Sequence, residues 1–208
     1  ISCRRRLNSR MLRRHVVFAT LLLLASLTVS VSSVAGEKLP RLPDLFGGPF
    51  LLTDEQGRRV GPDAYAGKFM LVYFGYGYCP DICPTDLTIM AAALDSLGES
   101  ADRIQPLLIS VDPSRDTPGA LREFTDAFHP DLIGLTGTEA EVVTAAKAYR
   151  VHRRRFQMEG MSGGDYLVDH STLTYLMGPD GRFVTMFPRG TTAEKMAKTL
   201  LKYISSGS

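Results

Sequence analysis

Hydrophobic residues form two nearly continuous runs in the middle of the chain. Residues 69–74 and 106–111 are apolar at successive positions rather than at alternate ones, which is typical of strands that are buried on both faces of a sheet. Between the runs, residues 84–97 carry Leu87, Met90 and Leu94 at helical spacing, which predicts a helix with one buried stripe. A strand, a helix and a second strand in this order predict a parallel crossover unit.

The pattern on either side of this unit predicts shorter elements. Residues 50–60 are typical of a hairpin with its turn at 55–57. The cluster from Asp112 to Thr117 is interpreted as a strand exit followed by a helix cap. The remaining expected elements are helices that begin at Thr117 and at Thr138, the second with Glu141 in a capping box, a strand at 132–135, strands at 173–177 and 182–187 around the turn Pro179-Asp180-Gly181, and a last helix at 192–204.

Two cysteines follow the first apolar run directly. After Gly75 and Gly77 come Cys79 and Cys83, and Pro84 suits the first turn of a helix. We therefore expect Cys83 near a helix N-terminus, where the dipole and the free amides favour a thiolate. A cysteine pair after the first central strand, together with the closing strand–strand–helix pattern, predicts an α/β, thioredoxin-like mixed sheet with helices on both faces.

The spacing of the pair, Cys-x-x-x-Cys, leaves three interpretations open. It is compatible with a structural disulfide, with a redox pair and with a metal site. Thiolates select soft ions, Cu(I) above all and zinc as a competitor. Because Cys79 and Cys83 alone would leave a metal under-coordinated, a metal site would need a third ligand.

His170 is the best candidate for that third ligand. It precedes the expected strand at 173–177, and in this topology the segment that enters that strand faces the cysteine turn. His152 lies beside the run Arg153–Arg155, a poor environment for a cation that we interpret as a solvated face. His129 is at a helix end and His15 in the N-terminal segment. Asp169 would serve as an outer partner that orients His170 or adds negative potential.

The first 35 residues differ in charge from the rest. They hold six arginines and no acidic residue, while the remaining 18 basic and 22 acidic residues give positions 36–208 a net charge of −4. The apolar run at 16–31 predicts a signal anchor, or a signal peptide cleaved after Ala35. Either would place the body outside the cytoplasm. A start at Met11 would remove Cys3 and leave Cys79 and Cys83 as the cysteines.

Behind this segment we expect two further regions. Residues 36–49 hold several prolines and are predicted to be a tether. Residues 50–208 are predicted to form one thioredoxin-like domain. Within it, 159–165 is glycine-rich and expected to be mobile. Met158 and Met161 carry soft thioether sulfur, but we expect them to pack or to lie in solvent. The net negative charge of residues 36–208 excludes a nucleic-acid-binding surface on this part of the chain.

Several segments together resemble the SCO/SenC family of copper chaperones for cytochrome c oxidase assembly: YFGYGYCPDICPTDL, ISVDPSRDTP, LIGLTGT, AYRVH and DYLVDHSTLTYLMGPDG. The resemblance covers residues 42–204. It implies a thioredoxin-like fold and a site that binds Cu(I) or Cu(II) through Cys79, Cys83 and His170. It also implies a role in building the binuclear copper centre of oxidase subunit II.

The resemblance leaves copper delivery and thiol reduction both open. A thiol–disulfide oxidoreductase that reduces the cysteines of subunit II would use Cys79 and Cys83 as its catalytic pair, so the motif serves either activity. A peroxiredoxin-like enzyme and a copper buffer without a delivery step are further alternatives. The expected partners are subunit II, another copper carrier or a thiol reductant, and the membrane through the N-terminal segment. The simplest location is a bacterial inner membrane, with the domain in the periplasm.

Overall fold

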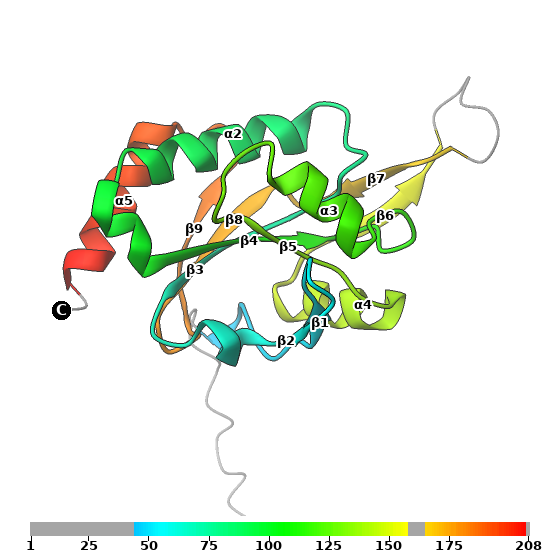
Figure 1. Ribbon diagram of the computed structural model, residues 1–208, viewed down its shortest axis with the longest axis horizontal. Helices are drawn as coiled ribbons and strands as arrows, with labels where there is room; N and C mark the ends of the chain where they lie inside the picture. The colour runs from blue at the N-terminus through cyan, green and yellow to red at the C-terminus, as the bar shows by residue number, and fades with distance from the viewer. Residues whose placement is uncertain (1–43, 158–164, 207–208) are drawn as a thin grey trace, which may run out of the picture. The chain divides into compact units, whose positions relative to one another are not determined.

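The fold is built on a five-stranded mixed sheet. The computed structural model describes residues 44–157 and 165–206. Within them the strand order is β5-β4-β3-β8-β9, with β3, β4 and β5 parallel and β8 and β9 antiparallel to their neighbours (Figure 1). The strands are β3 (Phe69–Gly75), β4 (Ile104–Ser110), β5 (Ile133–Leu135), β8 (Leu173–Met177) and β9 (Phe183–Pro188).

The two apolar runs become the two central strands of this sheet. All seven residues of β3 are buried, and six of the seven in β4. A strand in this position has both faces covered, so apolar side chains follow one another instead of alternating with polar ones. The buried Ser110 hydroxyl is an exception and donates to the Asp116 carboxylate. The prediction of buried strands at 69–74 and 106–111 is confirmed, as is the parallel crossover between them.

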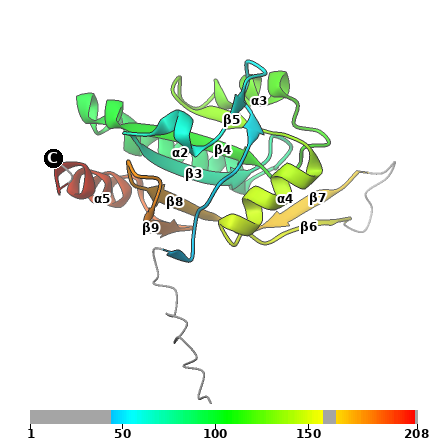
Figure 2. The same cartoon turned by 90° about the horizontal axis from the view of Figure 1, so that it is seen from below.

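Helices cover both faces of the sheet. α2 and α5 lie on one face, and α4 lies on the other (Figures 1 and 2). The predicted caps are present: Thr117 accepts a hydrogen bond from the amide of Ala120, and Thr138 forms the capping box with Glu141. The helices are α2 (Ile82–Asp95), α3 (Pro118–Thr125), α4 (Glu139–Ala148) and α5 (Ala193–Ser206), with short 3₁₀ helices η2 (Pro62–Tyr65) and η3 (Gly98–Arg103).

The predicted N-terminal hairpin is also present. It pairs β1 (Leu52–Thr53) with β2 (Arg59–Val60). The buried Asp54 carboxylate accepts hydrogen bonds from the turn amides of Gln56 and Arg58. Gly57 has φ of 79°, a left-handed conformation that glycine adopts without strain. The hairpin at 50–60 is therefore confirmed.

A second hairpin was not predicted. β6 (Arg153–Phe156) and β7 (Leu167–His170) form a separate two-stranded antiparallel sheet in which Arg153 pairs with His170. The interpretation of the arginine run as a solvated face was incomplete, because Arg153 bonds the Val111 carbonyl and Glu139. Three consecutive arginines show no alternation of apolar and polar positions, so the hydrophobic pattern contained no strand signal here.

Several expectations fall outside the described residues. Residues 1–43 are not among the described residues. They include the expected export segment at 1–35 and most of the expected tether, so the boundaries predicted for these two regions are not tested. The expected mobile segment at 159–165, which includes Met161, lies outside as well, apart from Asp165, and so does Met158. Among residues 44–157 and 165–206, no helix has both the length and the apolar character needed to cross a bilayer.

Candidate metal centre

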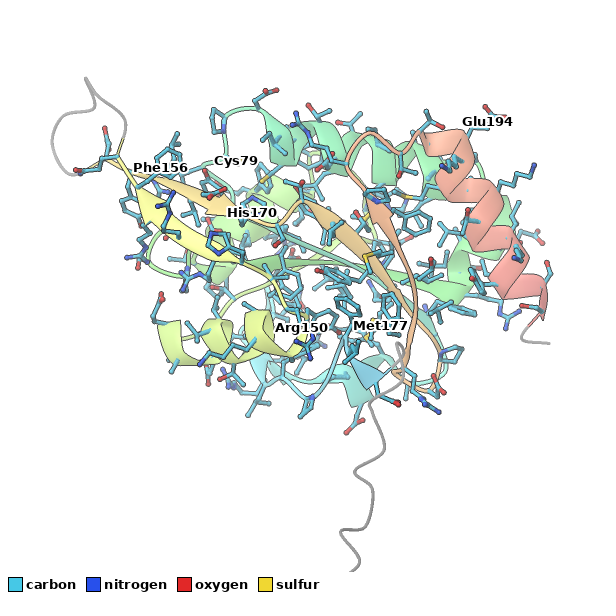
Figure 3. The ribbon with its side chains drawn as sticks, turned by 180° about the vertical axis from the view of Figure 1, so that it is seen from behind. Cys79, Arg150, Phe156, His170, Met177 and Glu194 are labelled. Carbon is cyan, nitrogen blue, oxygen red and sulfur yellow. The ribbon has the colours of Figure 1, made fainter. Side chains whose placement is uncertain are left out.

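Two thiols and one imidazole meet at one end of the sheet. The ligand atoms of Cys79, Cys83 and His170 all lie within 4.8 Å of one another, and the Cys83 Sγ is 3.5 Å from the His170 Nε2. Cys79 and His170 are labelled at this end in Figure 3. The structure thus brings together the three residues that the sequence singled out, although 87 positions separate Cys83 from His170.

The cysteines occupy two different local settings. Cys79 lies in the loop between β3 and α2 and is 9% exposed, whereas Cys83 is fully buried in the first turn of α2. The helix begins at Ile82, two residues earlier than predicted, so Cys83 lies inside it rather than in front of it. Both cysteines are free thiols, and the Cys83 amide donates a hydrogen bond to the Cys79 Sγ at 3.3 Å.

The two thiols differ in acidity because each affects the other. A hydrogen bond from Cys83 is the largest influence and, against burial, lowers the pKa of Cys79 to about 4, with His170 adding to the effect. The same hydrogen bond, followed by burial and by the nearby Cys79 charge, raises the pKa of Cys83 above its usual range. The pair therefore holds one negative charge readily and a second with difficulty, and Cys79 is the thiolate.

His170 is oriented by the backbone. Its Nδ1 lies 3.0 Å from the Ser171 carbonyl oxygen. Since that oxygen only accepts, Nδ1 carries a proton, and Nε2 is the ring nitrogen that faces Cys83. The expected outer partner, Asp169, instead lies 3.6 Å from the His152 Nε2 and 4.0 Å from the Arg154 Nη2. Successive side chains of a strand point to opposite faces, which separates Asp169 from the imidazole of its neighbour.

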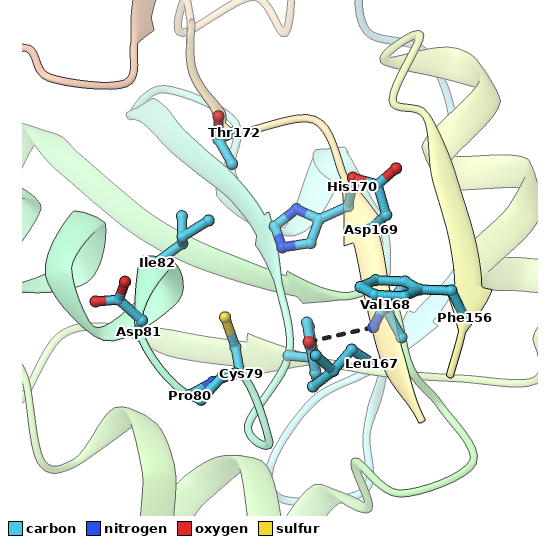
Figure 4. Close-up of a pocket in the computed structure, with 11 residues that line it drawn as sticks. Cys79, Pro80, Asp81, Ile82, Phe156, Leu167, Val168, Asp169, His170 and Thr172 are labelled. Carbon is cyan, nitrogen blue, oxygen red and sulfur yellow. Dashed lines mark hydrogen bonds between the residues drawn. The ribbon is translucent and has the colours of Figure 1, made fainter. Parts of the chain in front are cut away.

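An apolar pocket of about 220 Å³ adjoins the three residues (Figure 4). Cys79 and His170 line it together with Ile82, Phe156 and Leu167. Two tyrosine rings also face the imidazole edge-on, Tyr73 at 6.3 Å and Tyr76 at 5.8 Å between centroids. Cys79 and His170 thus face an open, mostly apolar pocket, while Cys83 is buried behind them.

Two glycines before the thiols are required by close approaches that the sequence did not reveal. A Cβ on Gly75 would lie 3.2 Å from the Cys83 Sγ and 2.8 Å from the Tyr73 ring. A Cβ on Gly77 would lie 3.1 Å from the Asp116 Oδ1, and the Gly77 amide donates to the same carboxylate at 3.2 Å. Burial raises the pKa of Asp116 to about 6, although its hydrogen bonds from Ser110 and Gly77 oppose the shift. The signal in the sequence was a pair of glycines between a buried strand and a cysteine.

The donor set suits a soft metal ion. Two sulfurs and an imidazole nitrogen are the ligand types that favour copper, with zinc as the competitor. The depressed pKa of Cys79 supplies one thiolate at neutral pH. The other histidines among the described residues lie apart from this group: His129 is near Asp95 and His152 near Asp169.

Comparisons with known proteins agree with this arrangement. The family model for SCO1/SenC matches residues 39–205. The chain is 46% identical over 154 residues to SenC of Rhodobacter capsulatus, covering 74% of this chain and 68% of that protein. It is 40% identical over 161 residues to sco1 of Schizosaccharomyces pombe, covering 77% of this chain and 61% of that protein. The chain thus spans less than two thirds of the fission yeast relative.

Solved structures show the same fold. The crystal structure of ScoI from Arabidopsis thaliana with copper bound superposes with a TM-score of 0.72 at 40% identity, covering 77% of this chain and 99% of that one. ScoI of Bradyrhizobium japonicum, also with copper bound, gives 0.70 at 42% identity, covering 76% and 99%. With a family match over four fifths of its length and relatives at this level of identity, the chain belongs to the SCO1/SenC family.

Proposed function

We propose that this protein binds copper through Cys79, Cys83 and His170 and delivers it to cytochrome c oxidase subunit II during assembly of the binuclear copper centre. The observation that carries the proposal is the convergence of the three ligand atoms within 4.8 Å in a protein with free thiols. Relatives of known structure at 40% and 42% identity hold copper, and the family resemblance implies oxidase assembly as the role.

The geometry suits a cargo ion better than a permanent cofactor. Cys79 and His170 border the open pocket, so thiolates of a partner can approach the bound ion and displace these ligands one at a time. The ion stays bound to at least one sulfur throughout, which keeps the barrier to exchange low. Cys79 is ionised at neutral pH, whereas the pKa of Cys83 is raised. Of the two thiols, Cys83 is therefore the one that releases a proton on binding.

Thiol–disulfide exchange is the second candidate, because an ionised and nearly buried Cys79 lies next to a protonated Cys83. In that reaction the Cys79 thiolate attacks a partner disulfide, releases one partner thiolate and forms a mixed disulfide. Cys83 then loses its proton, attacks Cys79 and releases the second partner thiolate. The partner gains two electrons, and this protein becomes a Cys79–Cys83 disulfide that a dithiol reductant must restore.

An anaerobic transfer experiment tests the main proposal. The reduced domain is titrated with Cu(I) and mixed with the reduced, metal-free subunit II domain, and copper on each protein is measured after separation. We expect one copper per domain and net movement to subunit II. Turnover of an oxidised subunit II domain without any dependence on copper would favour the oxidoreductase instead.

The contribution of His170 has its own test. We expect His170→Ala to change the Cu(II) absorption spectrum and to weaken Cu(II) binding, because the imidazole nitrogen supplies the hardest of the three donors. His152→Ala, directly before β6, is the control and should leave the spectrum unchanged. An unchanged spectrum and affinity in His170→Ala would remove this residue from the site.

We also propose that the domain lies in the periplasm, held to the inner membrane by the apolar segment at 16–31. The basic flank and the length of the apolar run support an anchor, and relatives include bacterial and mitochondrial proteins. Fractionation of the full chain, with carbonate extraction of the membranes, tests this. Release of the protein in the soluble periplasmic fraction would favour cleavage after Ala35.

A further inference from the structure

The motif VDPSRD, which the sequence explained only as a strand exit and a cap, has side chains in contact with the segments that carry the candidate ligands. It follows β4 directly. The Asp112 carboxylate is fully buried and pairs with the Nε of Arg115. The Arg115 Nη1 donates to the Tyr166 carbonyl at 3.1 Å, in the segment that enters β7. Arg115 thus connects the end of β4 to the strand that carries His170.

The Arg115 guanidinium also lies among three tyrosine rings. Its central carbon is 5.8 Å from the Tyr76 centroid, 4.8 Å from that of Tyr78 and 3.9 Å from that of Tyr166. Tyr76 and Tyr78 belong to the loop that leads to Cys79, whereas Tyr166 directly precedes β7. One cation therefore contacts both the cysteine loop and the histidine strand, at distances where cation–π attraction is effective.

Asp112 adds two further links between the end of β4 and the β6–β7 hairpin. Its carboxylate accepts hydrogen bonds from the Tyr166 hydroxyl at 2.7 Å and from the Arg155 Nη2 at 3.3 Å. Beside this cluster, the Tyr76 hydroxyl accepts from the amide of Val168 at 3.2 Å, drawn as a dashed line in Figure 4. Val168 is two residues before His170 in β7. The hydrogen bond at the Val168 amide is therefore one two-residue repeat of the strand away from the candidate ligand.

His170 needs such support because β7 is not part of the main sheet. It pairs only with β6 among the described strands. The thiols, in contrast, are fixed by β3 and by α2. The distance between the imidazole and the sulfurs therefore depends on how the β6–β7 hairpin is held against the cysteine loop.

We propose that Arg115 is a positioning residue for the metal site: paired with Asp112 and packed among Tyr76, Tyr78 and Tyr166, it holds β7 against the cysteine loop and so keeps His170 within reach of Cys83. A lysine cannot replace it, because an ammonium group has neither the planar face nor the fork of donors. This inference rests on the proposed copper site but concerns a residue that touches no metal.

The test compares Arg115→Lys with Arg122→Lys, an exposed arginine on α3 whose nearest acid is Asp126 at 3.7 Å. In the metal-free protein, hydrogen exchange at the Val168 amide, followed by NMR, should become at least about tenfold faster in Arg115→Lys and stay unchanged in Arg122→Lys. Cu(II) affinity should fall about tenfold, as for other outer partners of metal ligands.

A double-mutant cycle separates positioning from general damage. In a His170→Ala background, Arg115→Lys should cause no further loss of Cu(II) affinity. An equal loss in both backgrounds overturns the proposal, because Arg115 would then act on the thiols or on the fold. Unchanged exchange at Val168 overturns it as well. If the unmodified protein binds no copper, the proposed function fails, yet the exchange measurement still decides the role of Arg115.

Should Arg115→Lys fail to fold, Tyr166→Leu replaces it, since this change removes one ring and one hydrogen bond to Asp112 but leaves the ion pair intact. Tyr166→Leu should raise exchange at Val168 and lower Cu(II) affinity in the presence of His170 only. The proposal is overturned if this variant matches the unmodified protein in both measurements.

Discussion

The two halves of the candidate metal centre are built in different ways. The cysteines come from the junction of a wholly buried central strand, β3, with a long helix, α2. The histidine comes from the end of a two-stranded hairpin whose first strand is three arginines and a phenylalanine, largely exposed. The first half is held by the hydrophobic core and the second by ion pairs, hydrogen bonds and cation–π contacts.

This difference has a consequence for robustness. Core packing tolerates small surface changes and positions the sulfurs firmly. Polar links depend on geometry, and replacing one partner leaves a buried charge or donor unpaired. We therefore expect the sulfur pair to be the constant part of the site and the position of the imidazole to be the part that mutations adjust.

The largest expected effect is on Cu(I) affinity, when a ligand is removed from one half of the site or from the other. Cys83→Ala should weaken Cu(I) binding by about a hundredfold or more, beyond the roughly 10–100-fold that loss of an outer partner costs, because Cu(I) prefers sulfur. His170→Ala should cost clearly less for Cu(I). Competition with a chromophoric Cu(I) chelator measures both. Equal losses would contradict the division into a primary sulfur pair and an adjustable imidazole.

The second prediction concerns the pH dependence of the thiols. Because the pKa of Cys79 is lowered to about 4, this thiol is already ionised at pH 6.5, and its alkylation rate by iodoacetamide should change less than about twofold up to pH 8.5. A thiol with an ordinary pKa near 8.5 would gain roughly fiftyfold over that interval. Cys83, whose pKa is raised, should remain unmodified. Peptide mass spectrometry follows each site, and a fiftyfold rise at Cys79 would contradict the assignment.

A third prediction tests how tightly the cysteine half is packed. Gly75→Ala places a methyl 3.2 Å from the Cys83 Sγ, and we expect a loss of about 1–3 kcal/mol in the free energy of unfolding from overpacking. Gly119→Ala is the matched control, since nothing lies within 4 Å of its Cβ and it should stabilise by about 0.4–1 kcal/mol. Urea denaturation measures both, and similar effects in the two variants would contradict the tight fit.

The smallest expected effect is a loss of global stability that leaves the geometry of the site unchanged. Thr192→Ala removes the side-chain acceptor of the Lys195 amide at the start of α5, a helix that carries none of the three ligands, and should cost about 1 kcal/mol of stability. Cu(II) affinity and spectrum should not change. If they do, the position of the hairpin depends on the stability of the whole fold rather than on its own polar contacts. The two halves of the site would then not be held independently.

Sequence reasoning worked where hydrophobic pattern decides structure. Each feature set by core burial or by neighbouring residues was predicted correctly. These are the buried strands at 69–74 and 106–111, the cap at Thr138 and the turn Pro179-Asp180-Gly181. The cysteine pair was found by its place after a buried strand. His170 was selected largely by excluding the other histidines, and the structure brings it to the thiols.

The hairpin could not be predicted for a physical reason. Its strands are stabilised by partners that are far apart in the sequence, such as Arg153 on the Val111 carbonyl, 42 residues away. No periodicity within the segment reports such contacts. The same holds for Gly75, which is required because Cys83 approaches its backbone closely. It holds as well for Asp169, which lies opposite Arg154 of β6 in a strand pairing that the sequence did not indicate.

Because the two cysteines are unequally buried, the site is open on one side and closed on the other. Cys83 has no exposed surface, while Cys79 and His170 border the open pocket. An incoming ligand would therefore reach a bound copper ion from one side, and we expect the bond to Cys83 to be the last to break. Hand-over would then follow a fixed sequence rather than a random one, and the final intermediate would join the two proteins through a copper ion still held by the deepest sulfur.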